Sequence, residues 1–405
     1  MKKVLIVTYY APPVGMAGVL RVTKLAKFLP EFGWQPILLT VKPISYFLYD
    51  PDLLNDLAGI TIYRSESLDP ARLLYFFRKD KPITVKSTGP LFINYLLFPD
   101  AKVLWVPFAV SLGKKLIEQE KPSLIFATAP PYSALLIGVY LKNYARIPLV
   151  SDFRDAYPTG FTPPPIHFRY PVALLRRHIL KKSDAIVAVN QGTATKLEKK
   201  AIVIENGYDP DEFSAKDEVP SIFATIPPNH LTIFYAGTLW ENEDALFAFL
   251  EAAKGLKNLK VLVAGRASID CQSRLRAFSP IVNYLGVLSH QVVISLMKKA
   301  DILLYLTKPN QPAGIKLYEY FGAGKPILAV CEGCNEAVRL IEHHNAGLVS
   351  SLSPDEIKST LLAIIEKKGN FCNQSALGRY NRKKQAERLA ELFNSLTPTT
   401  VDHSP

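Results

Sequence analysis

Residues 311–327 read Gln311-Pro-Ala-Gly314-Ile-Lys316-Leu-Tyr-Glu319-Tyr-Phe-Gly-Ala-Gly324-Lys325-Pro326-Ile327. Apolar segments lie on both sides of this stretch, at 301–305 and 326–330, and each is predicted to be a buried strand. The glycine turn between them opens a short helix over 317–322. Because a crossover helix between two strands places those strands parallel in one sheet, the stretch predicts a parallel α/β fold.

The same alternation of apolar strands and amphipathic helices continues along most of the chain. It begins with a strand at 4–8 and a helix at 19–29, and it starts again after residue 201. Segment 43–100 fits the alternation poorly, and we expect it to be an insertion. The other predicted strands are 35–41, 124–127, 148–152, 185–189, 202–205, 231–236, 260–264 and 281–285, and the other predicted helices are 132–145, 244–254, 290–299, 355–367 and 376–396.

The length of 405 residues suits two domains better than one core. We expect an N-terminal domain at 1–200, a second domain at 201–375, and a C-terminal helix and tail at 376–405. The hydrophobic fraction of 48% can fill two such cores and excludes a disordered chain. No run of about 18 apolar residues occurs, so the sequence predicts no membrane-spanning helix.

Positive charge is concentrated in the first half of the chain. Residues 1–200 contain 27 Lys and Arg against 14 Asp and Glu, whereas the remainder is close to neutral. Such asymmetry predicts an anionic partner, and the aromatic-basic stretches 72–79 and 168–182 indicate an anionic membrane surface. A solvated basic surface is the alternative interpretation. No RNA- or DNA-binding motif accompanies the charge, so nucleic acid is not expected.

The cysteines and histidines lack metal-ligand spacing. Cys331 and Cys334 form a Cys-x-x-Cys pair, but no second pair or His-x₃₋₅-His completes a zinc set. Reduced thiols in a cytosolic protein are one interpretation, and a redox pair is the other. We therefore expect no metal and a cytoplasmic protein, with peripheral contact to the inner face of the cell membrane.

Two glycine-containing loops are candidate phosphate sites, because parallel sheets bind ligands beyond the carboxyl ends of their strands. The first contains Gly15 and Gly18 and leads into the helix of Arg21. Glycines let the backbone approach a ligand, and a helix N-terminus offers N–H groups to phosphate. In the second loop, Lys316 could neutralise a diphosphate and Glu319 could accept hydrogen bonds from ribose hydroxyls. Glu319 could equally be an ordinary acid favoured by the helix dipole.

The chain resembles the retaining GT-B glycosyltransferases of family 4, in the subgroup with an Asp-Phe-Arg-Asp motif. The resemblance rests on Gly-x-Lys-x-x-Glu-Tyr and Gly-Lys-Pro-Ile in the stretch quoted above, and on these further motifs: Pro130-Pro131-Tyr-Ser133, Val150-Ser-Asp152-Phe-Arg154-Asp155, Ile204-Glu-Asn206-Gly207-Tyr-Asp209, Tyr235-Ala-Gly237-Thr238-Leu239, Ala264-Gly265-Arg266 and Tyr284-Leu-Gly286.

This resemblance implies two Rossmann-like domains facing a cleft, with a C-terminal helix that returns to the first domain. It implies an acceptor-binding N-terminal domain and a nucleotide-sugar-binding C-terminal domain. The implied reaction is transfer of a hexose from a UDP- or GDP-sugar, with retention and without a metal or a tightly bound cofactor. The implied acceptor is a glycan or a lipid-linked glycan, in bacterial surface polysaccharide or glycolipid synthesis.

The resemblance also implies the site residues. The implied catalytic residues are Asp152, Arg154 and Asp155, for which a structural salt-bridge corner is the alternative. The implied donor-binding residues are Gly15, Gly18, Arg21, Gly237, Thr238, Arg266, Gln311, Gly314, Ile315, Lys316, Leu317 and Glu319.

The chain departs from the family pattern at three of these positions. Gln311 replaces a glutamate, Thr238 replaces an arginine, and Arg154 stands near the place of a frequent histidine. A nucleotide-sugar epimerase of the same architecture and a non-catalytic sugar-nucleotide or polysaccharide binder therefore remain alternatives, and dependence on an acceptor would separate an epimerase from a transferase.

Overall fold

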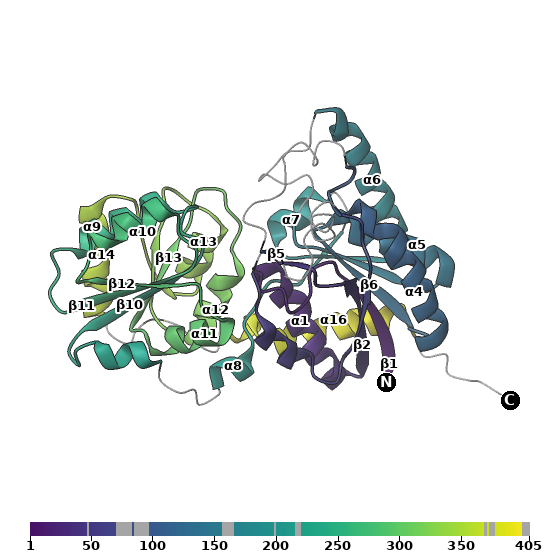
Figure 1. The fold of residues 1–405 in the computed structure, drawn as a ribbon, viewed down its shortest axis with the longest axis horizontal. Coiled ribbons are helices and arrows are strands. Elements are labelled where there is room, and N and C mark those ends of the chain that lie inside the picture. The colour runs from purple at the N-terminus through teal and green to yellow at the C-terminus, as the bar shows by residue number, and fades with distance from the viewer. Residues whose placement is uncertain are drawn as a thin grey trace. The chain divides into compact units, whose positions relative to one another are not determined.

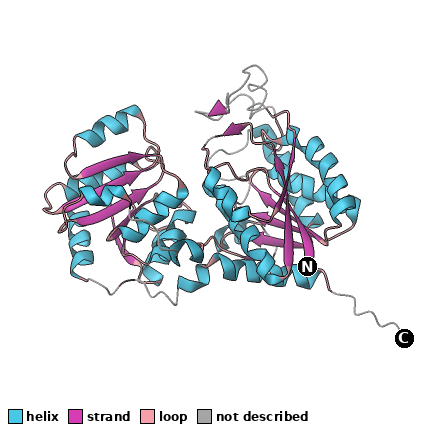
Figure 2. Ribbon diagram, turned by 60° about the horizontal axis from the view of Figure 1, so that its bottom comes forward, coloured by secondary structure: helices cyan, strands magenta, loops and turns pink. Residues whose placement is uncertain are grey.

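The computed structural model describes residues 1–46, 48–69, 83–84, 97–155, 166–197, 200–214, 220–367, 371 and 377–398. The chain divides into two compact units. Unit 1 contains Met1–Asn206 and Arg382–Pro405, and unit 2 contains Gly207–Asn381. Helices lie on both faces of the central strands in each unit (Figures 1 and 2).

Unit 1 is built on a parallel sheet with the strand order β4-β2-β1-β6-β7-β8-β9. Helices α4 and α5 pack on one face of this sheet, and α1 and α16 pack on the other. The strands are β1 (Lys2–Val7), β2 (Trp34–Val41), β4 (Thr61–Ser65), β6 (Leu124–Ala129), β7 (Leu149–Phe153), β8 (Ala185–Ala188) and β9 (Ile202–Val203), and the helices are α1 (Ala17–Phe28), α4 (Val106–Glu120), α5 (Tyr132–Ala145), α6 (Arg169–Lys182), α7 (Gln191–Lys196) and α16 (Arg382–Leu396). A separate pair joins β3 (Ser45–Tyr46) and β5 (Ile83–Thr84).

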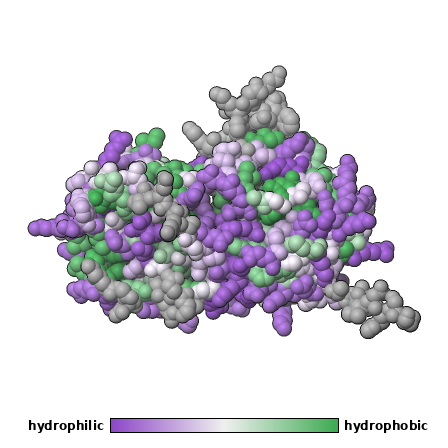
Figure 3. Space-filling view, turned by 90° about the horizontal axis from the view of Figure 1, so that it is seen from below, coloured by the Kyte–Doolittle hydropathy of each residue, from purple (hydrophilic) through white to green (hydrophobic). Residues whose placement is uncertain are grey.

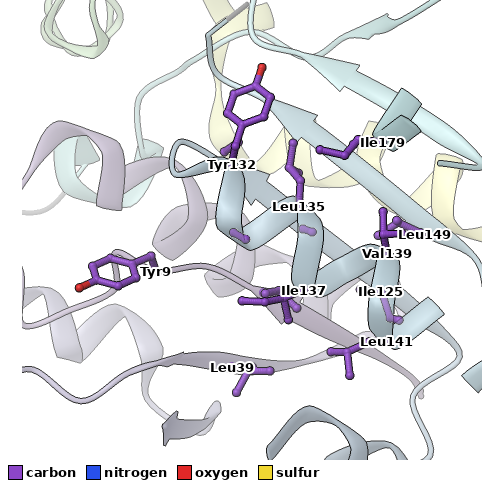
Figure 4. Packing of buried hydrophobic residues seen from close by; sticks show 14 of the residues in the cluster. Tyr9, Leu39, Ile125, Tyr132, Leu135, Ile137, Val139, Leu141, Leu149 and Ile179 are labelled. Carbon is purple, nitrogen blue, oxygen red and sulfur yellow. The ribbon is translucent and has the colours of Figure 1, made fainter. Parts of the chain in front are cut away.

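The apolar face of α5 shows why the sequence folds into these layers. Ile137, Val139 and Leu141 of α5 lie among Leu39, Ile125 and Leu149 of the strands (Figure 4). All of these side chains are buried. Burying a side chain of this size stabilises the fold by about 1.5–3 kcal/mol.

Unit 2 repeats the plan with the order β12-β11-β10-β13-β14-β15, again entirely parallel. One face is covered by α9, α10 and α14, and the other by α11, α12 and α13. The strands are β10 (Leu231–Ala236), β11 (Leu259–Ala264), β12 (Val282–Gly286), β13 (Ile302–Leu306), β14 (Ile327–Val330) and β15 (Gly347–Ser350), and the helices are α8 (Pro210–Ser214), α9 (Glu243–Ala253), α10 (Ile269–Arg276), α11 (His290–Lys299), α12 (Ile315–Ala323), α13 (Glu336–His343) and α14 (Pro354–Glu366).

The predicted fold of two Rossmann-like α/β domains is confirmed, and two expectations about its parts are corrected. The supposed insertion at 43–100 contains β4, which pairs with β2 and forms the edge of the sheet. Its half-buried side chains gave only a weak strand pattern. The last helix begins at Arg382, after a 3₁₀ turn at Gly378–Tyr380, and not at residue 376.

Helix α16 completes the core of unit 1. The ring of Phe393 packs edge-on against Trp34 and Phe126, at centroid distances of 5.2 and 5.8 Å. The chain leaves unit 1 at Asn206 and returns at Arg382, and these two residues meet through a side-chain hydrogen bond of 3.4 Å. Unit 2 is therefore an insertion between Asn206 and the last helix of unit 1.

No helix in the described ranges is long and apolar enough to cross a membrane. On the face shown in Figure 3, hydrophilic side chains are widespread in both units and hydrophobic ones form separate patches.

Candidate functional site

When the strands of each sheet are numbered along the chain, the sheet of unit 2 has the order 3-2-1-4-5-6, and the sheet of unit 1 has the order 3-2-1-4-5-6-7. In such sheets ligands bind beyond the carboxyl ends of the strands, where the strand order reverses. That point lies between β10 and β13 in unit 2, and between β1 and β6 in unit 1. The predicted site residues lie at or after the carboxyl ends of these strands or of a neighbouring strand.

Lys316 occupies the reversal point of unit 2. It is the second residue of α12, and its Nζ lies 4.5 Å from the ring centre of Tyr235 and 5.8 Å from that of Tyr305. A Cβ atom on Gly237 would lie 2.4 Å from this Nζ, so the glycine lets the ammonium approach the backbone closely. The structure therefore brings together two of the predicted residues, one after β10 and one after β13.

The charge of Lys316 is only weakly compensated. No ion pair joins Lys316 to a carboxylate in the part of the chain that the structure describes. Burial lowers the pKa of Lys316 to about 8, while the more distant charges of Glu319 and Glu241 act in the opposite direction. A half-buried ammonium on aromatic faces attracts an anion strongly, because little solvent screens it.

The backbone around Gly314 begins α12. Gly314 is the N-cap residue with extended backbone, and its N–H donates to the Tyr305 hydroxyl at 3.3 Å. The next N–H groups have no intrahelical acceptor, as at any helix start. Ile315 is half-buried, whereas Leu317 is fully buried in the core. Leu317 can therefore offer a ligand only its backbone.

Glu319 lies one turn further along α12 and is 8% exposed. Its Oε1 is 3.8 Å from Nε2 of His290, the first residue of α11. The same nitrogen lies 3.3 Å from Oε1 of Glu212 on α8. Sequence reasoning missed His290 because it examined histidines only for metal spacing. Its position at the start of the predicted helix 290–299 was the available signal.

Gln311 is held within its own loop. Its Oε1 accepts hydrogen bonds from the Lys308 N–H at 3.1 Å and the Thr307 hydroxyl at 3.3 Å. The side-chain amide of Asn335 donates to the Thr307 hydroxyl and the Lys308 carbonyl, at 2.9 and 2.8 Å. Sequence reasoning did not single out Asn335. Together these bonds fix the turn between β13 and α12.

Gly265 and Arg266 fix the loop after β11. Gly265 has φ +134°, and a Cβ atom there would collide with the Gly237 carbonyl. The Arg266 carbonyl accepts from the Leu239 N–H at 2.9 Å. Thr238 is half-buried, and its carbonyl lies 3.5 Å from the Tyr235 hydroxyl that donates to it. These contacts hold the loops after β10 and β11 together.

In unit 1, Arg21 and Asp152 form a fully buried ion pair. The Nε and Nη2 atoms of Arg21 donate to the two carboxylate oxygens at 3.1 and 2.8 Å, and neither side chain is exposed. Asp152 also accepts from the Thr128 hydroxyl at 2.7 Å, and Arg21 donates to the Glu205 carbonyl at 3.0 Å. Asp152 therefore pairs with Arg21, and neither side chain of the pair reaches the surface.

Arg154 donates to backbone carbonyls. Its guanidinium bonds the carbonyls of Ala129, Pro130 and Gly18, which joins the end of β6 to the start of α1. A Cβ atom on Gly18 would lie 2.6 Å from Nη1 of Arg154. Gly18 therefore allows the close approach of an arginine of the same unit. Burial raises the pKa of the adjacent Asp155, and the charge of Arg154 partly offsets this effect.

The other loops at this edge of unit 1 are also filled from within. A Cβ atom on Gly15 would lie 2.7 Å from the Cβ of Asp50, and the Gly15 N–H donates to the Leu48 carbonyl at 2.9 Å. Asp100 accepts from the backbone N–H and the hydroxyl of Ser133, at 3.0 and 2.8 Å, at the start of α5. The N-terminus of α5 is thus occupied by a carboxylate of the protein.

Within the described ranges, no three His, Cys, Asp or Glu side chains come together as a metal ligand set. Cys331 is buried and Cys334 is exposed, and both are free thiols. Burial raises the pKa of the Cys331 thiol, and the nearby Cys334 and Glu332 act in the same direction.

Two family models match the chain. Glycosyltransferase Family 4 matches residues 21–212, and Glycosyl transferases group 1 matches residues 230–367. No curated protein matches the chain.

Solved structures match nearly the whole chain at low sequence identity. HepE from Anabaena, solved with UDP and with UDP-glucose, has a TM-score of 0.64 and 17% identity, over 98% of this chain and 100% of that one. A glycosyltransferase from Rickettsia africae has a TM-score of 0.67 and 15% identity, over 98% and 99%. Sucrose-phosphate synthase from Thermosynechococcus elongatus has a TM-score of 0.68 and 13% identity, with the same coverage. At these identities the likeness shows the fold. The chain is therefore built from a glycosyltransferase family 4 domain followed by a glycosyl transferases group 1 domain, in the GT-B fold.

Proposed function

We propose that this protein transfers a hexose from a nucleotide-diphosphate sugar to a glycan or lipid-linked acceptor, with retention at the anomeric carbon. The observation that carries the proposal is the ammonium of Lys316, which lies against Gly237 at the reversal point of unit 2 without a carboxylate partner among the described residues. A cation held in this way is suited to the diphosphate of a donor.

The proposed donor site uses unit 2. The diphosphate contacts Lys316 and the backbone N–H groups that open α12, where the helix dipole also favours negative charge. Glu319 accepts hydrogen bonds from the ribose hydroxyls. Gly237, Thr238 and Arg266 form the loops beside the diphosphate, and Gln311 fixes the turn that leads into α12. UDP is the first nucleotide to test, because HepE of the same fold was solved with UDP and UDP-glucose.

Transfer places negative charge on the leaving diphosphate as the sugar bond breaks. Lys316 and the N-terminus of α12 stabilise that charge, so they contribute more in the transition state than in the ground state. With retention, the acceptor attacks the face from which the diphosphate leaves, and a diphosphate oxygen takes the acceptor proton. Unit 1 holds the acceptor. In this proposal Arg154 and the buried pair of Arg21 and Asp152 position loops and do not contact the donor.

The experiment is turnover of a panel of UDP- and GDP-sugars by purified protein, with a membrane extract from the source cells as acceptor. We expect acceptor-dependent transfer that Glu319→Ala and Lys316→Met each reduce strongly. NMR of the product would show whether the anomeric configuration of the donor is kept. Sugar isomerisation without an acceptor would instead indicate an epimerase, and nucleotide binding without turnover would indicate a binding protein.

We also propose that unit 1 docks on an anionic membrane surface through α6, as a peripheral protein at the inner face of the cell membrane. Helix α6 contains no acidic residue, and its basic residues accompany Tyr170 and Leu174, which are 72% and 49% exposed. The other predicted stretch, 72–79, lies outside the described residues. Exposed aromatic and aliphatic groups among basic ones favour an anionic lipid surface over a soluble anion.

Co-sedimentation with vesicles of rising phosphatidylglycerol content tests this docking. Each basic side chain near such a surface contributes about 1 kcal/mol, so the double change Arg177→Glu and Lys181→Glu should weaken binding more than tenfold at low salt. The matched control is Lys257→Glu with Lys358→Glu, two exposed lysines of unit 2. Equal binding by both double variants, or binding that ignores salt, would contradict the proposal.

A further inference from the structure

The imidazole of His290 lies between two carboxylates from different helices. Its Nε2 is 3.3 and 3.4 Å from the two oxygens of Glu212 on α8, and 3.8 Å from Oε1 of Glu319 on α12. Helices α8, α11 and α12 pack against each other in pairs, so three elements meet at this nitrogen. The side chains are 14%, 22% and 10% exposed for His290, Glu212 and Glu319.

The surroundings of His290 differ from those of His344, another histidine in unit 2, which lies in its core. His344 is also buried, but its Nε2 lies 2.9 Å from the Tyr380 hydroxyl, and among the described residues it forms no ion pair with a carboxylate. Burial and the neighbouring His343 and Arg379 lower the pKa of His344, which favours its neutral form. His290 therefore differs from a histidine that only fills a core.

We propose that His290 is a positioning residue, which holds the carboxylate of Glu319 in the orientation that the ribose of a nucleotide diphosphate requires. The inference rests on the proposed role of Glu319. A carboxylate that accepts from two hydroxyls must present both lone-pair directions at once, so a small rotation weakens both hydrogen bonds. Glu319 has only one turn of helix between it and Lys316, and the imidazole is the group that faces it from the side of α11.

Glu212 orients His290 in turn. The contact of 3.3 Å is within hydrogen-bond reach, and a carboxylate beside an imidazole favours its protonated form. The Glu212 carbonyl also accepts from Nζ of Lys298 at 3.2 Å, which ties the backbone of α8 to α11. A protonated His290 places one positive charge between the carboxylates of Glu212 and Glu319. Attraction to this charge restrains the orientation of both carboxylates.

The charged groups that face this cluster set the direction of its pH dependence. They are Glu212 from α8, Glu319 and Lys316 from α12, and Lys298 from α11, while the packed strand β10 contributes only Tyr235 as a titratable group. Loss of the imidazole proton removes the cation between the acids. Nucleotide affinity should therefore be lower when the imidazole is neutral than when it is protonated.

The test compares the affinities of UDP and 2′,3′-dideoxy-UDP by calorimetry between pH 5.5 and 8. In the unchanged protein the hydroxyls of UDP should give at least tenfold tighter binding at pH 6. His290→Gln should reduce this preference to about threefold and make it independent of pH, with little effect on dideoxy-UDP. Glu212→Gln, a second variant that leaves the imidazole in place, should give an intermediate preference. His343→Gln, at an exposed histidine of the same unit, is the matched control.

Three outcomes would overturn the positioning role of His290, and one of them would also overturn the ribose role of Glu319. If Glu319→Gln reduces the preference for UDP but His290→Gln leaves it unchanged at every pH, the positioning role of His290 is wrong and the ribose role of Glu319 stands. If Glu319→Gln itself leaves the preference unchanged, the ribose role fails and the inference on His290 fails with it. Equal losses for UDP and dideoxy-UDP in His290→Gln would show a merely structural histidine.

Discussion

The carboxyl edges of the two sheets use their charges in opposite ways. In unit 1 the charged side chains already have partners within the unit. Arg21 pairs with Asp152, Arg154 donates to three backbone carbonyls, and Asp100 accepts from the N–H group at the start of α5. In unit 2, Lys316 lies on two aromatic rings with no ion pair to a carboxylate in the described chain. The same topology therefore gives one edge whose charges hold the unit together and one whose charge is available to an anion.

This difference shows that two similar motifs, each with a glycine near the end of a parallel strand, can have different roles. Glycines near a parallel strand end indicate a close approach, but they do not say what approaches. Arg154 approaches Gly18, and Lys316 approaches Gly237. In the first case the arginine is satisfied by carbonyls, and in the second the ammonium can gain a new partner.

The largest expected effect comes from breaking the buried pair of unit 1. Asp152→Asn removes one charge and leaves Arg21 buried without its counter-charge, which should cost about 3–5 kcal/mol of stability. Chemical unfolding followed by the fluorescence of Trp34 and Trp105, both buried in unit 1, measures this loss. The double change Arg21→Met and Asp152→Leu should lose less than the single change. A loss below about 1 kcal/mol for Asp152→Asn would contradict the assigned structural role.

The second effect is expected in unit 2, where removing a charge should raise stability and weaken ligand binding. Lys316→Met should weaken UDP binding by about tenfold to a hundredfold, because a charge-assisted contact contributes about 1.5–3 kcal/mol. The same change should stabilise unit 2 by about 1–3 kcal/mol at pH 7, since it removes a half-buried charge. Lys299→Met, at an exposed lysine, serves as the control for both measurements.

The sign of the stability effect follows from the two pKa values. The pKa of Lys316 is about 8 in the folded unit and about 10.4 in an unfolded chain. Between these values the unfolded chain binds more protons, so stability rises with pH across that window and the full cost of burial is present below it. The advantage of Lys316→Met should therefore be largest at pH 7 and vanish above about pH 10.5. An unchanged stability at pH 7 would refute the argument.

The third effect is a loss of nucleotide affinity at alkaline pH. Because the lowered pKa of Lys316 is about 8, its charge is lost as pH rises through that value, and UDP affinity should fall about fivefold to tenfold between pH 7.5 and 9. The diphosphate is fully ionised throughout this range. Titration calorimetry on the unchanged protein and on Lys316→Met measures the effect, and a slope that persists in the variant would assign it to another group.

The smallest effect is expected at Gln311. Its Oε1 is bonded within the loop, so Gln311→Ala should cost about 0.5–1.5 kcal/mol of stability and change UDP affinity less than threefold. Thermal unfolding measures the loss of stability, and titration calorimetry on the same sample measures the change in UDP affinity. Together they distinguish a residue that fixes the loop from one that binds the donor. A tenfold loss of affinity with unchanged stability would place Gln311 on the donor.

The sequence predicted the layers of the fold well because apolar strands alternate with helices of clear period. The predicted helix 132–145 and strand 231–236 match α5 and β10 to the residue. Edge strand β4 was missed because only one of its five side chains is buried. Helix α16 was predicted six residues too long at its start, since the pattern of apolar residues continues through the 3₁₀ turn.

The candidate site was less predictable than the fold. Sequence motifs identified Lys316 and Glu319, because they share one short helix with a glycine turn. They did not show that Arg21 pairs with Asp152, which is 131 positions away in the chain. Asn335 was missed for the same reason, since its partners Thr307 and Lys308 precede α12 on another part of the chain. Pairings over such separations depend on the tertiary fold.

The return of the chain at Arg382 has a consequence for the order of folding during synthesis. The core around Trp34 and Phe126 includes Phe393, which is synthesised after the whole of unit 2. Unit 2 is made from one continuous segment and can close its own core first. The usual order, in which the N-terminal domain folds first, is therefore reversed. Unit 1 must keep the apolar surface that α16 covers exposed to water, or to a chaperone, until α16 has been made.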